Sequence, residues 1–215
     1  MRRSLVTVLA LLALGRTTPV LAQTCMGMAS FRHAPFQMTG SGHFSQLSNS
    51  FGASLGFGLP FGPYGTVGVS STAYDGVTGS AVGLGARAGF QLMMGKAQIC
   101  PNAGYTLEMG PNEDATGVDL LSRRASFGLQ VGTMLSAGPR LQVVPSVGLV
   151  YVRSRDTAEN SSGASLYDIS NEYGMADLGL GIVLTRQISI RPGVELPVGI
   201  EGGEPSVGVT VGYNW

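Results

Sequence analysis

Two residues with the chemistry of a hydrolase stand close together at His43-Phe44-Ser45. A histidine can act as the base that activates a serine nucleophile, and a spacing of two residues puts both side chains on one face of a β-strand. A working pair also needs a carboxylate that orients the histidine, and the sequence assigns none to it. Because the pair shares its strand face with polar residues, we interpret it as part of a polar interior and predict no catalytic residue.

Six charged residues fall on the polar side of alternating segments, three of each sign: Arg87, Glu108, Arg124, Asp177, Arg191 and Glu195. A charge in a narrow interior needs an opposite partner, because an unpaired one is costly. We expect Glu108 to pair with Arg124. We also expect Arg191 to reach between Asp177 and Glu195. Two facing carboxylates would alternatively form an acid–base site with a raised pKa. The balance of signs favours a salt-bridged plug and disfavours an ion-selective pore.

The two cysteines, Cys25 and Cys100, belong to a chain that begins with a secretion signal, so an oxidising compartment is expected. Cys100 should point inward near the periplasmic end of its strand, and Cys25 lies just after the expected cleavage site. A disulfide would tether residues 23–35 across the mouth of the fold, whereas two free thiols are the alternative. The sequence shows no cluster of metal ligands and no phosphate-binding loop, so we expect no cofactor and no metal.

Three arginines, Arg123, Arg153 and Arg155, share the opposite, outward parity near the ends of their strands. Arginine binds phosphate well, so these side chains are candidate contacts for lipopolysaccharide phosphates. The alternative is that they belong to solvated strand ends.

The segments that hold these residues alternate bulky apolar and small polar side chains with a period of two, the period of a β-strand. The last residues show it best, because Val207, Val209, Val211, Tyr213 and Trp215 share one face while glycine and small polar residues share the other. Nine further segments follow the pattern, which predicts ten strands, or eight if residues 36–60 are misread. The ten segments are 36–46, 49–60, 66–74, 80–92, 97–109, 125–135, 141–152, 176–185, 188–200 and 205–215.

The composition indicates whether the apolar faces of these strands contact a protein core or lipid. Only 12% of residues are charged, the net charge is zero and 33 of 215 residues are glycine. A soluble β-sandwich needs a charged outer face, and a nucleic-acid-binding protein needs a basic one. We therefore predict an all-β fold, a closed antiparallel up-and-down transmembrane β-barrel with small side chains inside. A secreted soluble β-protein is the alternative.

The first residues form a targeting signal rather than part of the fold. Met1-Arg2-Arg3 is positive, an apolar run follows, and Val20-Leu21-Ala22 suits cleavage after Ala22. Lipidation at Cys25 is disfavoured because Thr24 precedes it. We predict a signal peptide at 1–22, an N-terminal periplasmic segment at 23–35 and the barrel at 36–215.

The lengths of the turns and loops between the strands predict the orientation of the barrel in the membrane. Tight turns at 61–65, 93–96, 136–140 and 186–187 alternate with a set that includes long polar loops at 111–119 and 156–168. Short turns are periplasmic in outer-membrane barrels, so both termini should be periplasmic. Aromatic residues should form two interfacial rings, with Tyr64 in the periplasmic ring and Tyr173 near the outer one.

A signal peptide, alternating glycine-rich strands and a chain end reading Val-Gly-Tyr-Asn-Trp resemble the small outer-membrane β-barrel proteins of Gram-negative bacteria, the OmpA/OmpX-like superfamily. The resemblance implies that the protein lies in the bacterial outer membrane among lipids and lipopolysaccharide. It also implies that Tyr213 and Trp215 form the signal read by the barrel-assembly machinery. It implies no single activity, because members serve as anchors, adhesins, narrow pores or lipid-modifying enzymes.

The preferred function is a non-enzymatic barrel with a structural or surface-interaction role and a largely plugged lumen. A narrow pore for small solutes is the first alternative. The second is a lipid A-modifying enzyme that uses His43 and Ser45, although in the family such residues face the lipid, and here they share the polar face. No nucleic-acid partner is expected, and the sequence predicts no oligomeric state.

Overall fold

The structure is a computed structural model that describes Cys25, Met28 and residues 35–59, 61–94, 97–111, 118–137, 141–160, 164–199 and 203–215. The expected signal peptide and most of the segment 23–35 lie outside the described residues. No helix in the described part of the chain is long and apolar enough to cross a bilayer. The strands are β1 (Phe36–Phe44), β2 (Ser48–Gly58), β3 (Pro63–Tyr74), β4 (Ser80–Phe90), β5 (Leu92–Met94), β6 (Ala97–Met109), β7 (Val118–Gly132), β8 (Leu135–Ser136), β9 (Gln142–Asn160), β10 (Ser165–Val183), β11 (Ile188–Val198) and β12 (Ser206–Asn214).

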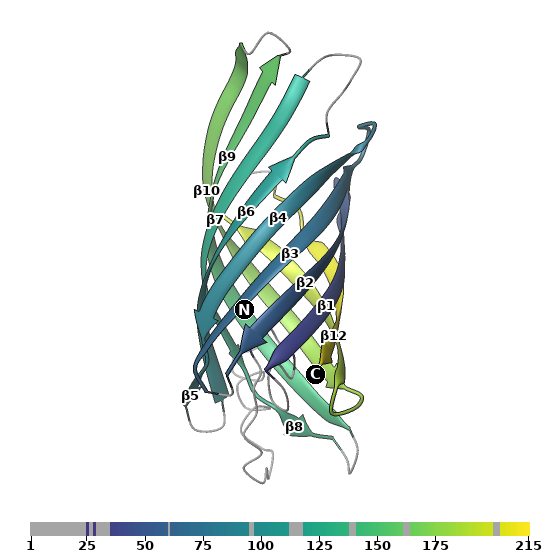
Figure 1. Cartoon of the computed structure of the whole chain (residues 1–215), viewed down its shortest axis with the longest axis vertical. Coiled ribbons are helices and arrows are strands. Elements are labelled where there is room, and N and C mark those ends of the chain that lie inside the picture. Colours follow the sequence, from purple (N-terminus) through teal and green to yellow (C-terminus); the bar gives the residue numbers. More distant parts are fainter. Residues whose placement is uncertain are drawn as a thin grey trace.

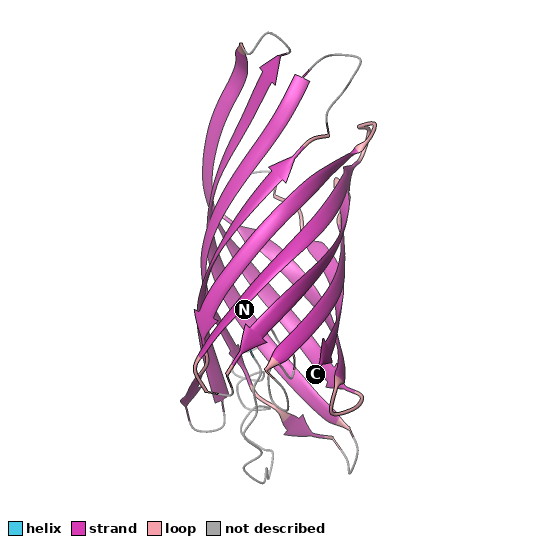
Figure 2. Cartoon of the chain, in the orientation of Figure 1, coloured by secondary structure: helices cyan, strands magenta, loops and turns pink. Residues whose placement is uncertain are grey.

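The strands close into one antiparallel barrel (Figure 1). Around the ring the order is β1, β2, β3, β4, β6, β7, β9, β10, β11 and β12, and β12 pairs back with β1. The short strands β5 and β8 pair with β6 and β9 and so continue the lines of β4 and β7. The prediction of ten strands is confirmed. The alternative of eight is wrong, because residues 36–58 form two paired strands from Phe36↔Phe57 to Phe44↔Asn49. Strand dominates the described chain in Figure 2.

The bulky apolar residues cover the outside of the closed sheet. In β12, for example, Val207 is 54% exposed and Val209 and Val211 are each 45% exposed, while Gly208 and Thr210 between them face inward. Water would penalise so much exposed apolar surface, whereas hydrocarbon does not. A closed sheet also leaves no unpaired edge, which the interior of a bilayer requires. The fold is therefore that of a transmembrane barrel.

One end of the barrel carries the start of β1 and the end of β12, and we call it the terminal end. The other end carries the tip of the β9–β10 hairpin, and we call it the hairpin end (Figure 1). An aromatic group lies outside the terminal end. Phe36 stacks on Trp215 with ring centroids 6.0 Å apart, and Trp215 stacks on Tyr213 at the same distance. Such rings suit the depth of lipid headgroups.

The interpretation of residues 156–168 as a long polar loop is wrong. Both β9 and β10 are 19 residues long and stay paired almost to their tip. A strand of that length measures about 60 Å, whereas a tilted membrane strand needs only about 9–11 residues. On β9 the outward apolar side chains end at Tyr151, and Arg153 and Arg155 follow with the same parity. The hairpin therefore leaves the membrane and protrudes, as Figure 1 shows.

Two aromatic residues expected in the interfacial rings face the lumen instead. Tyr64 is only 4% exposed and packs beside Cys25 and Cys100. It lies inside because β3 begins at Pro63, earlier than predicted, which gives Tyr64 the inward parity. Tyr173 also has the inward parity, since its cross-strand partner is the buried Val152.

Candidate functional site

The inner wall is built so that long side chains can lie flat across a narrow lumen. A Cβ at position 179 would overlap the guanidinium of Arg191, and a Cβ at 193 would lie 3.1 Å from its Nη1. A Cβ at 208 would lie 2.8 Å from Nδ1 of His43. Glycine at these positions therefore makes room for charged and aromatic groups that larger residues would displace.

The middle of the lumen holds an ion pair between β10 and β11. Nη2 of Arg191 donates to Oδ2 of Asp177 at 2.5 Å, and Nε2 of Gln130 donates to the same oxygen at 3.0 Å. Both charged side chains are largely withdrawn from water, with 11% and 16% of their surface exposed. Arg191 therefore pairs with Asp177 and does not bridge to Glu195, although Asp177 and Glu195 are cross-strand partners. A neutral, hydrogen-bonded group of this kind stiffens the wall rather than presenting a net charge.

Glu195 instead faces His43 from across β12. Its Oε1 lies 3.9 Å from Nδ1 of His43, and Oγ of Ser206 donates to its Oε2 at 3.3 Å. The two residues meet because Gly208, the register partner of His43, leaves open space between them. The acid that the sequence did not assign to His43 is therefore Glu195.

Ser45 does not join this pair. It lies in the turn after β1, where its Oγ exchanges hydrogen bonds with the backbone of Ser48. His43 faces the lumen and Ser45 closes a turn, so a base and a nucleophile are not brought together.

A third charged group lies toward the hairpin end. Nη2 of Arg124 is 3.4 Å from Oε2 of Glu108, and the hydroxyl of Tyr74 donates to Oε1 of the same carboxylate. Glu108 is buried while Arg124 stays partly exposed. Each oxygen of the carboxylate thus has a partner, Tyr74 for Oε1 and Arg124 for Oε2.

Arg87 differs from the other lumen charges. It lies on the inward face of β4, is exposed to the lumen, and forms no ion pair or hydrogen bond with the described residues. It lines a cavity of about 330 Å³ together with His43, Asp177, Arg191 and Glu195. The expected network is therefore three separate groups plus one solvated arginine. The reason is that water in the cavity can solvate a charge that a dry interior would force into a pair.

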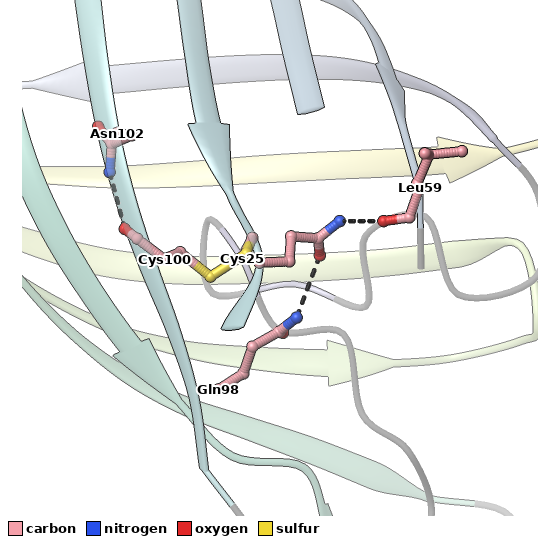
Figure 3. The surroundings of a disulfide bond; sticks show 6 residues. Cys25, Leu59, Gln98, Cys100 and Asn102 are labelled. Carbon is pink, nitrogen blue, oxygen red and sulfur yellow. Dashed lines mark hydrogen bonds between the residues drawn. A yellow bond between two sulfur atoms is a disulfide. The ribbon is translucent and has the colours of Figure 1, made fainter. Parts of the chain in front are cut away.

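The disulfide closes the terminal end. Cys25 is bonded to Cys100 of β6, with a Cα–Cα distance of 5.7 Å, and both residues are fully buried. The predicted disulfide is thus confirmed. Figure 3 shows the polar residues around it. Nε2 of Gln91 donates to the backbone oxygen of Leu59 at 2.7 Å, and Gln98 donates to Gln91 at 3.2 Å.

Two of the three outward arginines lie on the protruding hairpin and pair with acids there. Arg123 and Arg155 are cross-strand partners on β7 and β9. Nε of Arg155 donates to Oδ1 of Asp168 at 2.8 Å, which lowers the pKa of the Asp168 carboxyl and raises that of the guanidinium. Arg153 lies 3.6 Å from Glu172. Arg123 alone of the three has no ion pair within the described ranges, so it is the arginine with most donors to spare for a phosphate.

Sequence reasoning missed Tyr74, Gln130 and Ser206, which complete the three lumen groups. Each has the inward parity, but neutral polar residues are common on that face and nothing in their type sets them apart. Among the described residues, no group of three or more histidines, cysteines and acids could hold a metal ion.

No protein-family model and no curated protein matches the chain. Solved structures do. The translocator domain of the autotransporter NalP from Neisseria meningitidis is 13% identical, with 84% of this chain and 87% of that domain aligned and a TM-score of 0.52. The chain has the fold of an outer-membrane β-barrel.

Other outer-membrane barrels align over most of the chain with lower TM-scores. The β domain of the Bordetella autotransporter BrkA is 12% identical, with 85% of this chain and 99% of that domain aligned and a TM-score of 0.48. LpxR from Salmonella typhimurium is 8% identical, with 83% of this chain and 100% of LpxR aligned and a TM-score of 0.46. At these identities the likeness to outer-membrane barrels concerns the fold alone, and the function must come from the site.

Proposed function

We propose that this outer-membrane barrel is a non-conducting protein whose lumen is plugged at the terminal end and whose protruding hairpin acts at the cell surface. The terminal end would face the periplasm, because the tight turns lie there. Its working part would then be the wall of β7, β9 and β10 that extends beyond the outer leaflet.

The observation that carries the plugged lumen is the position of Cys25 and Met28. Cys25 is bonded to β6, while the Cε atom of Met28 would lie 3.0 Å from a Cβ at Gly212 of β12. β6 and β12 are five places apart in the ring of ten, so they face each other across the lumen. Two residues of the N-terminal segment thus span the opening, and both are buried, Cys25 at 0% and Met28 at 1% exposure.

The charges inside the barrel support the same proposal. Two carboxylates, Glu108 and Asp177, are neutralised by arginines of neighbouring strands. A selective pore favours one sign of charge along its path. The cavity of 330 Å³ beside Arg87 favours a narrow pore instead, because it provides polar space within the barrel.

Planar-bilayer recording distinguishes a plugged lumen from a narrow pore. The oxidised, full-length mature protein should show no steady unit conductance. A reproducible unit conductance from the oxidised protein would overturn the proposal. The Cys25→Ser/Cys100→Ser double variant then identifies what closes the lumen: it conducts if the cross-linked segment is the barrier, and stays silent if the lumen charges suffice.

We further propose that the outward arginines contact lipopolysaccharide phosphates, with Arg123 as the main contact. Its guanidinium forms no ion pair with a described residue, and it is the cross-strand partner of Arg155, beyond the last outward apolar residue of β9. We also propose that Tyr213 and Trp215, whose rings stack outside the terminal end, are recognised by the barrel-assembly machinery.

A further inference from the structure

The hairpin end contains apolar side chains that the membrane does not explain. Tyr167 and Ile169, on the inner face of β10, are 41% and 51% exposed, and both lie closer to the hairpin tip than Glu172 of the outer face. Leu47 and Val77, in the turns after β1 and β3, are 58% and 41% exposed. Large apolar groups exposed to water mark a place where something binds.

These four residues line one cavity of about 580 Å³, which we call the vestibule. That volume is in the usual range of small-molecule sites. Tyr74, Glu108 and Arg124 form part of its lining and lie on the lumen side. The vestibule shares no lining residue with the 330 Å³ cavity deeper in the barrel, so it is a separate site.

The vestibule is negatively charged. Among the described residues that line it, the acids are Asp75, Glu108 and Asp156, and the one cationic side chain is that of Arg124. Arg124 is paired with Glu108, which leaves two carboxylates in excess. Neither Asp75 nor Asp156 forms an ion pair with any described residue. An apolar wall with unpaired carboxylates complements a ligand that has an apolar body and a positive charge.

Other atoms of the vestibule fit the same ligand. Tyr167 presents an aromatic ring to the cavity, and aromatic faces attract ammonium groups. Oγ of Ser122, the register partner of Asp156, is buried with no hydrogen-bond partner among the described residues and borders the cavity.

We propose that the vestibule binds small amphipathic cations, molecules with an aromatic or aliphatic body and an ammonium group. The ammonium group lies between Asp75 and Asp156, and the apolar body packs against Leu47, Val77 and Ile169. The site belongs to the wall and turns of the hairpin end, so it does not depend on whether the lumen below is plugged.

The test is calorimetric titration of the folded, oxidised protein in a neutral detergent, with benzyltrimethylammonium as the cation and phenylacetate as the anion of similar body. The cation should bind at least ten-fold more tightly than the anion. Equal binding of the two ions, or no binding of the cation, overturns the proposal. Blank micelles correct for partitioning of the probes into detergent.

Variants locate the site. Asp156→Asn and Ile169→Ser should each weaken binding of the cation about five-fold or more, for loss of a charge and of an apolar contact. Asp119→Asn is the matched control, because Asp119 also lies in the protruding wall, at the start of β7, but faces outward opposite Glu159. If Asp119→Asn weakens binding as much as Asp156→Asn, the cation is held by the general surface charge and the proposal fails. A conducting barrel would appear in the bilayer recordings and not in these titrations, so the two proposals fail separately.

Discussion

Replacing Gly179 by alanine tests whether the glycine-rich inner wall exists to seat the central ion pair. A Cβ at 179 would overlap the guanidinium of Arg191. That group is the flexible end of a long side chain, so it should move away and lose its contact with Asp177. A hydrogen bond between charged groups contributes about 1.5–3 kcal/mol. Alanine regains about 0.4–1 kcal/mol by restricting the unfolded chain. The net loss in the free energy of unfolding should therefore be about 1–2 kcal/mol.

The assay is reversible denaturant unfolding of the barrel in lipid vesicles, followed by tryptophan fluorescence and by the heat-dependent gel shift of folded barrels. Gly40→Ala is the matched control, because Gly40 faces outward on β1 and nothing lies within 4 Å of a Cβ there. That variant should keep or slightly raise the stability. A second comparison uses Arg191→Ala, in which the overlap no longer exists.

The substitutions at 179 and 191 form a double-mutant cycle. Gly179→Ala should cost stability when Arg191 is present and should cost little when position 191 is alanine. An equal loss in both backgrounds would show that the glycine serves the backbone rather than the ion pair. A loss no larger than that of Gly40→Ala would refute the role of the wall altogether.

Three further outcomes are expected. Cys100→Ser should lower the stability by about 4 kcal/mol in the chain-entropy model, since the disulfide closes a sequence separation of 75 residues; an unchanged unfolding midpoint under oxidising conditions would contradict this. Arg123→Ala should weaken lipopolysaccharide binding roughly five-fold. The measurement is the shift in thermal stability on adding lipopolysaccharide. Arg155→Ala should weaken this binding less, because the Arg155 side chain is held by Asp168. Arg155 lowers the pKa of Asp168, so the pair supports the hairpin above the ordinary aspartate pKa and is lost as the pH falls through the lowered value; carboxyl-carbon NMR should show that pKa rising in Arg155→Ala, and no rise would disprove the pairing.

The barrel was predictable because a lipid-facing strand must repeat its apolar residues every second position. The same criterion failed on the protruding hairpin. Beyond Tyr151 the outward positions are Arg153 and Arg155 rather than apolar residues. The period of two therefore continues, but charged residues take the place of apolar ones. A strand outside the membrane has no lipid to face, and its period can be seen only if charged residues are counted with the apolar ones.

The lumen was harder to predict than the strands. The alternation along each strand correctly placed the six expected lumen charges inside the barrel. The short β10–β11 turn also set Asp177 opposite Glu195. The alternation did not show that His43 would reach Glu195, because that contact crosses β12 and depends on Gly208 leaving the space open. Nor did it show that Arg87 would remain alone, since partners across a lumen depend on the tilt and stagger of the strands, which alternation does not encode.

The bond between Cys25 and Cys100 has a consequence for how the polypeptide withstands cutting. It encloses β1 to β5 and every turn between them within one covalent ring. A protease that cleaves the backbone once inside that ring, at the exposed turn near Asp75 for instance, yields fragments that cannot drift apart until a reductant acts. The severed strands would stay registered in the wall, so a nicked molecule would keep its shape and its place in the bilayer.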